Sequence, residues 1–306
     1  MSFNFFQNSI RFSAMSTDVL IKAKTSKQNI NTAMNTILEV ETKLNAYSKN
    51  SEISLINSNA SIKHVNISDI TKKVLQTSIE VAEITNGLFD PTIGALTQKT
   101  YGFGTKSMNI PPLQKIKYAQ KKVNYKNIEL NANSAYLKEK NMALDLGAIG
   151  KGYAAQLAIE TLKKLGASSA LVSVGGEIVC YGQNFKIAVS HPREKKHLCI
   201  ITTKKEQTSI STSGDYERYI TDYDTHHILN PKTATQNNDY ASLTLISTTK
   251  DASTLDAFTT AMFNMKDREL KEFANSNNLG VLTFTKGEDI EISSSFIQNT
   301  KGLFMP

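Results

Sequence analysis

The sequence of 306 residues predicts an α+β fold with mixed, largely antiparallel sheets and packed helices in a two-lobed arrangement. Short β-like runs follow one another through the middle of the chain; residues 170–182 read as a strand, a Gly-Gly turn and a second strand. Helical patterns stand between groups of strands and do not alternate strictly with them, which is typical of α+β folds. Because no Pro/Gly linker divides the chain, residues 1–306 are expected to form a single domain, with a candidate lobe boundary near 102–112.

The N-terminal part of the chain predicts one strand and two helices. Residues 18–24 alternate like a strand, and a helix follows Ser26, a suitable N-cap, with apolar side chains at helical spacing. Residues 67–85 predict a second helix, with Gly87 placed just past its end. Residues 45–60 are polar and turn-rich.

The remaining elements follow from similar signals. Pro111-Pro112 opens a short third helix, because proline favours first-turn positions. Further helices are expected from about residue 150 to residue 164 and from about 253 to 265. The last predicted strand pair surrounds a turn at Gly287.

Composition limits the class of protein. A hydrophobic share of 40% and a charged share of 21% are ordinary for a soluble globular protein. The net charge is +7, but the lysines form small scattered clusters and no basic stripe interleaved with aromatic residues, so no nucleic-acid partner is expected. A positive field would instead attract an anionic small ligand. The two cysteines, Cys180 and Cys199, fit no metal-binding spacing and are expected to be reduced core thiols.

The N-terminal residues carry no secretion or lipidation signal as the sequence is written. MSFNFFQNSIRFSAM has no basic region followed by an apolar stretch and no cysteine for a lipid anchor. No apolar run reaches the roughly 18 residues of a membrane span. The chain is therefore expected to be cytoplasmic as written, or periplasmic if a leader was removed.

Two glycine-containing segments carry a carboxylate in a position that could contact a ligand. Residues 87–96 hold a turn-forming Asp90-Pro91 between apolar residues; Asp90 is either the local cap of a structural turn or a carboxylate offered to a ligand. Residues 144–155 place three glycines and Lys151 at a strand-to-helix junction, where a helix N-terminus attracts anions. This segment matches neither a Walker nor a GxGxxG pattern, so an anion site and tight packing remain alternatives.

Two later segments offer a base and hard oxygen ligands. Residues 211–233 contain small hydroxyls and the pair His226-His227, whose side chains point to opposite faces of an extended segment, so at most one faces a site. A histidine of near-neutral pKa can take a proton from a hydroxyl. Asp256 and Thr260 lie four residues apart on one helix face, where they suit Mg²⁺ or form a capping or solvated pair.

Together these segments resemble one family, the ApbE-type FAD:protein FMN transferases, also described as thiamine-biosynthesis lipoproteins. The resemblance runs from about Met15 to Met265 and implies an ApbE-like, T-fold-like architecture. Ala234 stands where the family usually has glycine, a departure that removes no functional group. The resemblance rests on an ordered series of motifs: AMSTDVLI, YSKNSEISLIN, GLFDPTIGAL, LDLGAIGKGYAA, LVSVGGEI, STSGDYERY, HHILNPKT and LDAFTTAM.

The resemblance implies specific site residues. His227 matches the histidine that activates the acceptor hydroxyl, and Asn57 closes an SExSxxN-like motif near the metal and FAD. Magnesium would be held by the Ala148 main-chain oxygen with Asp256 and Thr260, and Thr259 would offer a further main-chain oxygen. The residues expected to bind FAD are Met15, Tyr47, Asn57, Leu88, Phe89, Asp90, Asp145, Lys151 and Ile228.

The resemblance also implies a reaction. A Ser/Thr hydroxyl of an acceptor flavoprotein would attack the FMN-side phosphorus of FAD, releasing AMP and leaving FMN in phosphoester linkage. Mg²⁺ would neutralise charge that develops during phosphoryl transfer, and Lys151 would assist. Two alternatives remain open: a Mg²⁺-dependent FAD pyrophosphatase with water as acceptor, and a non-catalytic flavin-binding protein.

Overall fold

The computed structural model describes residues 7–306; residues 1–6, which open the N-terminal stretch considered for a leader, lie outside the described residues. Within residues 7–306 the central feature is an eight-stranded sheet in which every neighbouring pair is antiparallel, which confirms the predicted α+β class. In spatial order its strands are β1 (Gln7–Ala14), β2 (Thr17–Lys24), β6 (Ala170–Val174), β7 (Glu177–Tyr181), β10 (Thr208–Gly214), β11 (Tyr240–Ser247), β12 (Gly280–Thr285) and β13 (Ile290–Ile292).

Two three-stranded sheets accompany the large sheet in the same described range. One has the order β14-β9-β8 and the other β3-β5-β4, again with antiparallel neighbours. Their strands are β3 (Val65–Asn66), β4 (Ile128–Leu130), β5 (Ser134–Leu137), β8 (Lys186–Ser190), β9 (His197–Thr203) and β14 (Thr300–Phe304).

The helices are mostly amphipathic. Among those in residues 7–306, none combines the length and the apolar character needed to cross a membrane. The α-helices are α1 (Lys27–Leu44), α2 (Glu52–Ser58), α3 (Asp69–Ile84), α4 (Gly94–Thr97), α5 (Leu113–Gln120), α6 (Gly150–Lys164), α7 (Ala252–Phe263), α8 (Asp267–Ser276) and α9 (Ser294–Gln298), and short 3₁₀ turns occupy Tyr125–Asn127 and Tyr223–Thr225.

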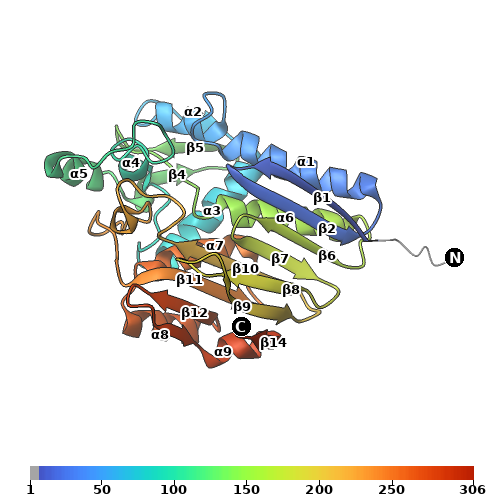
Figure 1. Ribbon diagram of the computed structural model, residues 1–306. Coiled ribbons are helices and arrows are strands. Elements are labelled where there is room, and N and C mark those ends of the chain that lie inside the picture. Colours follow the sequence, from blue (N-terminus) through green and yellow to red (C-terminus); the bar gives the residue numbers. More distant parts are fainter. Residues whose placement is uncertain (1–6) are drawn as a thin grey trace.

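The large sheet is packed on both faces. Helices α6 and α7 lie against strands β6, β7, β10 and β11, and α1 packs on α6 (Figure 1). The alternation along β6 shows the two sides: Val172 belongs to the core beneath the helices, whereas Leu171 belongs to the core shared with β8 and β9. Cys180 and Cys199 are buried free thiols in this second core, as predicted.

Local signals explain why the predicted helices form where they do. The Ser26 hydroxyl accepts a hydrogen bond from Asn29 N at 3.2 Å and begins α1, as expected of an N-cap. Helix α3 ends before Gly87, which adopts φ +79°. Helix α6 begins at Gly150 and ends at Lys164, the bounds that the sequence predicts.

The polar, turn-rich residues 45–60 contain a helix that the sequence pattern does not predict. Residues Glu52–Ser58 form α2, which Ser51 caps by accepting from Ser54 N at 3.0 Å. The helix is only seven residues long and buries only Ile53 and Ile56. Two apolar positions are too few to reveal a helical period in the sequence. Strand β11 is likewise absent from the sequence-based predictions. It is buried at every position, so its sequence lacks the polar-apolar alternation that marks a half-buried strand.

Helices α6 and α7 approach each other closely at Gly152. A Cβ built on this residue would lie 2.2 Å from the Ala252 carbonyl oxygen and 2.7 Å from Asp256 Cβ. These atoms belong to backbone and to a buried helix, so neither can move aside cheaply. The absence of a side chain at residue 152 therefore sets the distance between the two helices.

We expect Gly152→Ala to separate α6 from α7 and to lower the free energy of unfolding by about 1–3 kcal/mol or more, because overpacking strains a close-packed interface. Urea denaturation measures the change. Gly302→Ala in β14 is the matched control, since its nearest neighbour would be Thr202 Cβ at 3.9 Å. Equal stability of the two variants would contradict this account of the helix contact.

Candidate functional site

The N-terminus of α6 is capped by a side chain from another helix. Ile149, at the N-cap position, makes no side-chain cap hydrogen bond. Instead, Asp256 Oδ2 on α7 accepts from the Gly152 main-chain N–H at 2.9 Å, which satisfies one of the free amides at the helix start. The close approach at Gly152 is what allows this contact. Asp256 is thereby fixed beside the positive end of the α6 dipole.

Lys151 lies between two buried carboxylates. Its Nζ atom is 3.4 Å from Glu177 Oε1 and 3.7 Å from Asp256 Oδ1. Glu177 begins β7 directly after the Gly175-Gly176 turn, and it is 1% exposed, while Asp256 is 2% exposed. Three ionisable groups from α6, α7 and β7 therefore share one small polar region.

Burial dominates the electrostatics of this region. It raises the pKa of Glu177 to about 8, and the neighbouring Asp256 carboxylate adds to the increase. Burial also raises the pKa of Asp256, although Lys151 opposes the change. Burial alone would lower the pKa of Lys151, but the two carboxylates outweigh it and the pKa is raised. The Lys151 ammonium group thus lies beside two carboxyl groups whose protonated, neutral forms are favoured by burial.

The charge and donor set of this region fit a divalent cation. Glu177 Oε2 and Ser211 Oγ are both buried and neither makes a hydrogen bond of standard geometry among the described residues, although Ser211 lies close enough to Glu177 to lower its pKa slightly. Burial raises the pKa of Glu177 to about 8, so its carboxyl group is mostly neutral at pH 7, and a cation beside it would favour the ionised form. Within residues 7–306 no three His, Cys, Asp or Glu side chains form a ready-made metal cluster, so any ion here would also need hydroxyl and main-chain oxygens.

The other expected metal ligands surround Asp256 and the α6 N-terminus. Thr260 follows Asp256 by one turn of α7 and is partly exposed. Thr259 is buried, and its hydroxyl donates to the Leu255 carbonyl at 2.7 Å, so only its main-chain oxygen is a candidate ligand. Ala148 lies two residues before α6 and is partly exposed.

Asp145 is held at the edge of this region by the loop that contains Asp90. The Asp145 N–H donates to the Pro91 carbonyl at 2.8 Å, and Thr97 Oγ1 donates to Asp145 Oδ2 at 2.6 Å. Both Asp90 oxygens accept from groups within the fold, Oδ1 from the Thr92 amide and hydroxyl and Oδ2 from Tyr125 N at 2.9 Å. The Asp90 side chain therefore caps its own loop.

The apolar members of the expected FAD site lie mainly in the core. Leu88 and Phe89 are 6% and 3% exposed, and Ile228 is 6% exposed. All three belong to the core that lies beneath the helices. Their side chains fix the loops that carry them, so any contact with a ligand would come from the backbone or a small exposed edge.

Asn57 fixes the strand-like segment that precedes Asp145. Its Oδ1 atom accepts from Leu144 N at 2.6 Å, and its Nδ2 atom donates to the Leu144 carbonyl at 3.0 Å. One amide side chain thus satisfies both polar groups of a single residue, as a neighbouring strand would. Asn57 therefore holds this segment in place, and both its amide oxygen and its amide nitrogen are engaged by Leu144.

Tyr47 and Met15 approach the site from the N-terminal part of the chain. Tyr47 is 49% exposed, and its hydroxyl donates to the Phe103 carbonyl at 2.5 Å. Burial of the hydroxyl, with a further effect of Asp145, raises the pKa of Tyr47 to about 12. Met15 lies in the β1–β2 turn with φ +53°, and its Cε atom is 3.4 Å from the place of a Cβ on Gly150.

The two adjacent histidines have different environments. His226 is fully buried; its Nδ1 atom accepts from Ile228 N at 3.2 Å and its Nε2 atom lies 3.3 Å from the Asn237 carbonyl. His227 is partly exposed, with Nδ1 3.1 Å from the Arg218 carbonyl and its ring edge against Phe103. Of the two rings, only that of His227 has exposed surface.

His227 is a neutral imidazole at physiological pH. Burial in the site wall and the charge of Arg218 lower its pKa to about 3. Its Nδ1–H donates to the Arg218 carbonyl in the tautomer that this contact favours, which leaves Nε2 as an acceptor. The ring can therefore accept a proton on the side away from Arg218.

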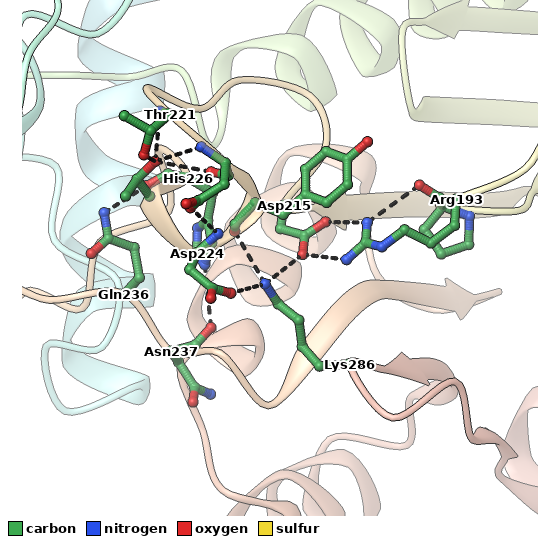
Figure 2. Close-up of polar contacts among 12 residues, drawn as sticks. Arg193, Asp215, Thr221, Asp224, His226, Gln236, Asn237 and Lys286 are labelled. Atoms are coloured by element: carbon green, nitrogen blue, oxygen red, sulfur yellow. Dashed lines mark hydrogen bonds and ion pairs between the residues drawn. The ribbon is translucent and has the colours of Figure 1, made fainter.

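Ion pairs centred on the buried Asp215 anchor the loop that leads to His227. Arg193 contacts Asp215 through two hydrogen bonds of 2.7 Å each, and Lys286 Nζ lies 3.0 Å from Asp215 Oδ2 (Figure 2). Lys286 also contacts Asp224 at 2.5 Å and donates to the Tyr223 carbonyl at 3.2 Å. Because Asp215 is fully buried at the start of the loop and Asp224 lies near its end, Lys286 joins the two ends.

The structure joins some of the predicted residues and leaves others apart. Lys151 and Asp256 meet, and Asp145, Asn57 and the Asp90 loop form one connected unit. No hydrogen bond or ion pair in the described part of the chain joins His227 to Lys151 or Asp256, although the Lys151 charge contributes to the lowered His227 pKa.

Sequence reasoning missed three polar groups. Glu177 was inside a quoted motif but received no role; a charged residue opening an otherwise apolar strand was the available signal. Thr97, the partner of Asp145, and Lys286, the anchor of the His227 loop, gave no signal because their contacts span 48 and 62 residues.

Comparison with known proteins identifies the family. Residues 15–283 match the sequence profile of the ApbE family. The FAD:protein FMN transferase of Buchnera aphidicola subsp. Baizongia pistaciae is 31% identical over 263 residues, covering 80% of this chain and 75% of that protein. The FAD:protein FMN transferase of Escherichia coli K12 is 26% identical over 260 residues, covering 80% and 73% respectively.

A solved structure agrees with this family at the level of the fold. The crystal structure of the ApbE protein from Thermotoga maritima has a TM-score of 0.86 and 28% identity to this chain, and the match covers 97% of this chain and 100% of that one. The family profile spans far more than half of the sequence and includes every site residue that the sequence predicts, while Lys286 lies just beyond its end. From this match and the shared fold, we conclude that the protein belongs to the ApbE family.

Proposed function

We propose that this protein is an FAD:protein FMN transferase that moves the FMN half of FAD to a Ser/Thr hydroxyl of an acceptor flavoprotein and releases AMP. The observation that carries the proposal is the position of Lys151 at the α6 N-terminus, between the buried carboxyl groups of Asp256 and Glu177. A helix N-terminus with a lysine suits the pyrophosphate of FAD, and the excess of carboxylate oxygens suits a divalent cation.

The metal proposed for this site is Mg²⁺. Asp256, Thr260 and the main-chain oxygens of Ala148 and Thr259 would hold it, since all are hard oxygen donors. When bound, Mg²⁺ would supply neutralisation of the charge on the pyrophosphate. The α6 amides and Lys151 bind and orient the same phosphates, while Gly152 keeps Asp256 beside them.

His227 is proposed as the general base. Its Nε2 atom is free to accept the proton of the acceptor hydroxyl. The pKa of about 3 is not the near-neutral value expected from the sequence: it keeps the ring unprotonated at neutral pH but also makes it a weaker base than an ordinary imidazole. As the acceptor oxygen forms its bond to the FMN-side phosphorus, the bond from that phosphorus to the AMP oxygen breaks. Met15, Tyr47, Asp145, Ile228 and the Leu88–Asp90 segment are proposed to form the surroundings of FAD.

The direct test incubates the purified protein with FAD, Mg²⁺ and a flavin-acceptor domain that carries a Ser/Thr flavinylation site, with and without EDTA. A fluorescent acceptor band in a denaturing gel, accompanied by AMP release and lost with EDTA, would support the transferase. AMP with free FMN and no labelled acceptor would favour the pyrophosphatase. FAD that binds but never yields AMP would contradict both enzymes.

Asp256→Asn should lower transfer by at least about 100-fold, because it removes a charged oxygen while keeping an oxygen that accepts from Gly152. AMP release at several Mg²⁺ concentrations measures the effect. Asp251→Asn on the same helix is the control, since it changes an N-cap of α7 to one of equal quality. Wild-type turnover in Asp256→Asn would remove this residue from the metal site.

His227→Gln should reduce transfer to the acceptor by about 10²- to 10⁴-fold, the usual contribution of a general base. FAD affinity, measured by flavin fluorescence, should change little because the base acts on the acceptor. His226→Gln is expected instead to lower stability, since that ring is buried against Phe263. A transfer rate that His227→Gln leaves unchanged would mean that another group takes the proton.

Lys286→Met should lower kcat for transfer by about 10- to 100-fold, because it releases the loop that positions His227. The KM for FAD should stay near the wild-type value, and Lys286→Arg should restore much of the rate. Lys271→Met is the matched control, since Lys271 also bridges two carboxylates, Asp267 and Glu291, away from this loop. Equal losses in both variants, in step with reduced stability, would rule out a positioning role.

A further inference from the structure

The net charge of the protein is concentrated in one segment. Residues 99–140 contain nine lysines and two glutamates, with no arginine and no aspartate. This excess of seven positive charges equals the formal net charge of the entire chain, +7. The formal charges of the remaining residues sum to zero, so this segment accounts for the excess positive charge of the protein.

Most lysines of this segment lack a partner. The two glutamates are already engaged, Glu139 with Lys122 at 2.8 Å and Glu129 with Lys138 at 3.4 Å. By contrast, Lys115, Lys117 and Lys121 on α5 and at its C-terminal end form no ion pair among the described residues, and all are exposed. Unpaired lysines so close together repel one another, a cost that an anionic partner would relieve.

Large apolar side chains accompany these lysines. Leu113 and Tyr118 of α5 are 63% and 56% exposed, whereas the helix buries only Ala119. We call Leu113, Lys115, Lys117, Tyr118 and Lys121 the α5 face. Exposed apolar groups among unpaired charges are typical of a surface that a protein partner covers.

The α5 face adjoins the wall of the candidate site. Ala119 belongs to the same apolar cluster as Phe103 and Leu229, and Phe103 contacts the His227 ring. Gln120 Nε2 also donates to the Lys232 carbonyl, so α5 rests on the segment that follows His227. Figure 1 shows α5 beside this loop at the end of the molecule away from the N-terminus.

We propose that the α5 face is the docking surface for the acceptor, and that it binds an acidic segment with apolar side chains near the acceptor hydroxyl. This inference rests on the proposed transfer to a protein hydroxyl, since only a macromolecular acceptor needs a surface beside the site. A membrane surface fits less well, because α5 has eight residues and presents no extended apolar face. Complementary charge at such a rim mainly accelerates association.

The test uses two threonine peptides of equal length, one with glutamate and leucine around the threonine and one with lysine in place of glutamate. Binding is measured by fluorescence anisotropy without FAD, and kcat/KM is measured with FAD and Mg²⁺. The variant replaces Lys115, Lys117 and Lys121 by glutamate. The control variant replaces Lys24, Lys27 and Lys205, also exposed and without ion pairs in the described chain, so the net charge changes equally.

The wild type should bind the acidic peptide at least about tenfold more tightly than the basic one, increasingly so at low salt. The α5 variant should lose this preference with an unchanged KM for FAD, whereas the control variant should keep it. Equal losses in both variants, or no preference in the wild type, would overturn the proposal. So would phosphatidylserine vesicles that bind the wild type but not the α5 variant while peptide binding stays unchanged.

Binding and transfer fail separately in this design. A wild type that prefers the acidic peptide but never releases AMP contradicts the proposed function and leaves the docking surface supported. A wild type that flavinylates the acceptor domain but has no charge preference contradicts the docking surface alone.

Discussion

The candidate site depends on one contact between two helices, the hydrogen bond from the Gly152 amide to the Asp256 carboxylate. It requires a residue without a side chain on α6, a carboxylate on α7, and a packing distance that only glycine permits. The same contact holds a negative charge in the core, where Lys151 and the α6 dipole compensate it. Stability and chemistry are thus joined at one place, since the residue that caps α6 is also the proposed metal ligand.

The two sides of the site are built differently. The side proposed to bind phosphate consists of helix starts and strand ends packed on the large sheet, so its groups are fixed by the core. The base side is a loop, held by Arg193, Asp215 and Lys286 and by a buried histidine. Rigid groups suit the charge stabilisation proposed for the first side, whereas a loop can adjust to the protein acceptor proposed for the second.

The sequence predicted the positions of helices correctly where the apolar periodicity and the capping residues indicated the same boundaries. Ser26, Gly87 and the Gly150–Lys164 pattern gave correct helix positions because each signal is local. It failed for α2, which is short, and for Glu177 and Lys286, whose roles arise from contacts between distant segments. The metal and FAD assignments came from the family resemblance and stay predictions, as does the lobe boundary near residues 102–112. Spacing alone did not separate Asp90 as a cap from Asp90 as a ligand; its hydrogen bonds show the cap.

The contact of Asn57 with Leu144 has a consequence for how this protein can change over time. The side chain imitates a strand neighbour, donating and accepting within one peptide unit. Aspartate could not donate, and glutamine would be one methylene too long, so few replacements preserve both bonds. Substitutions on the solvent-exposed side of α2 are therefore tolerated, whereas few are tolerated at residue 57. There a single side-chain amide fixes the position of the segment that leads into the site relative to α2.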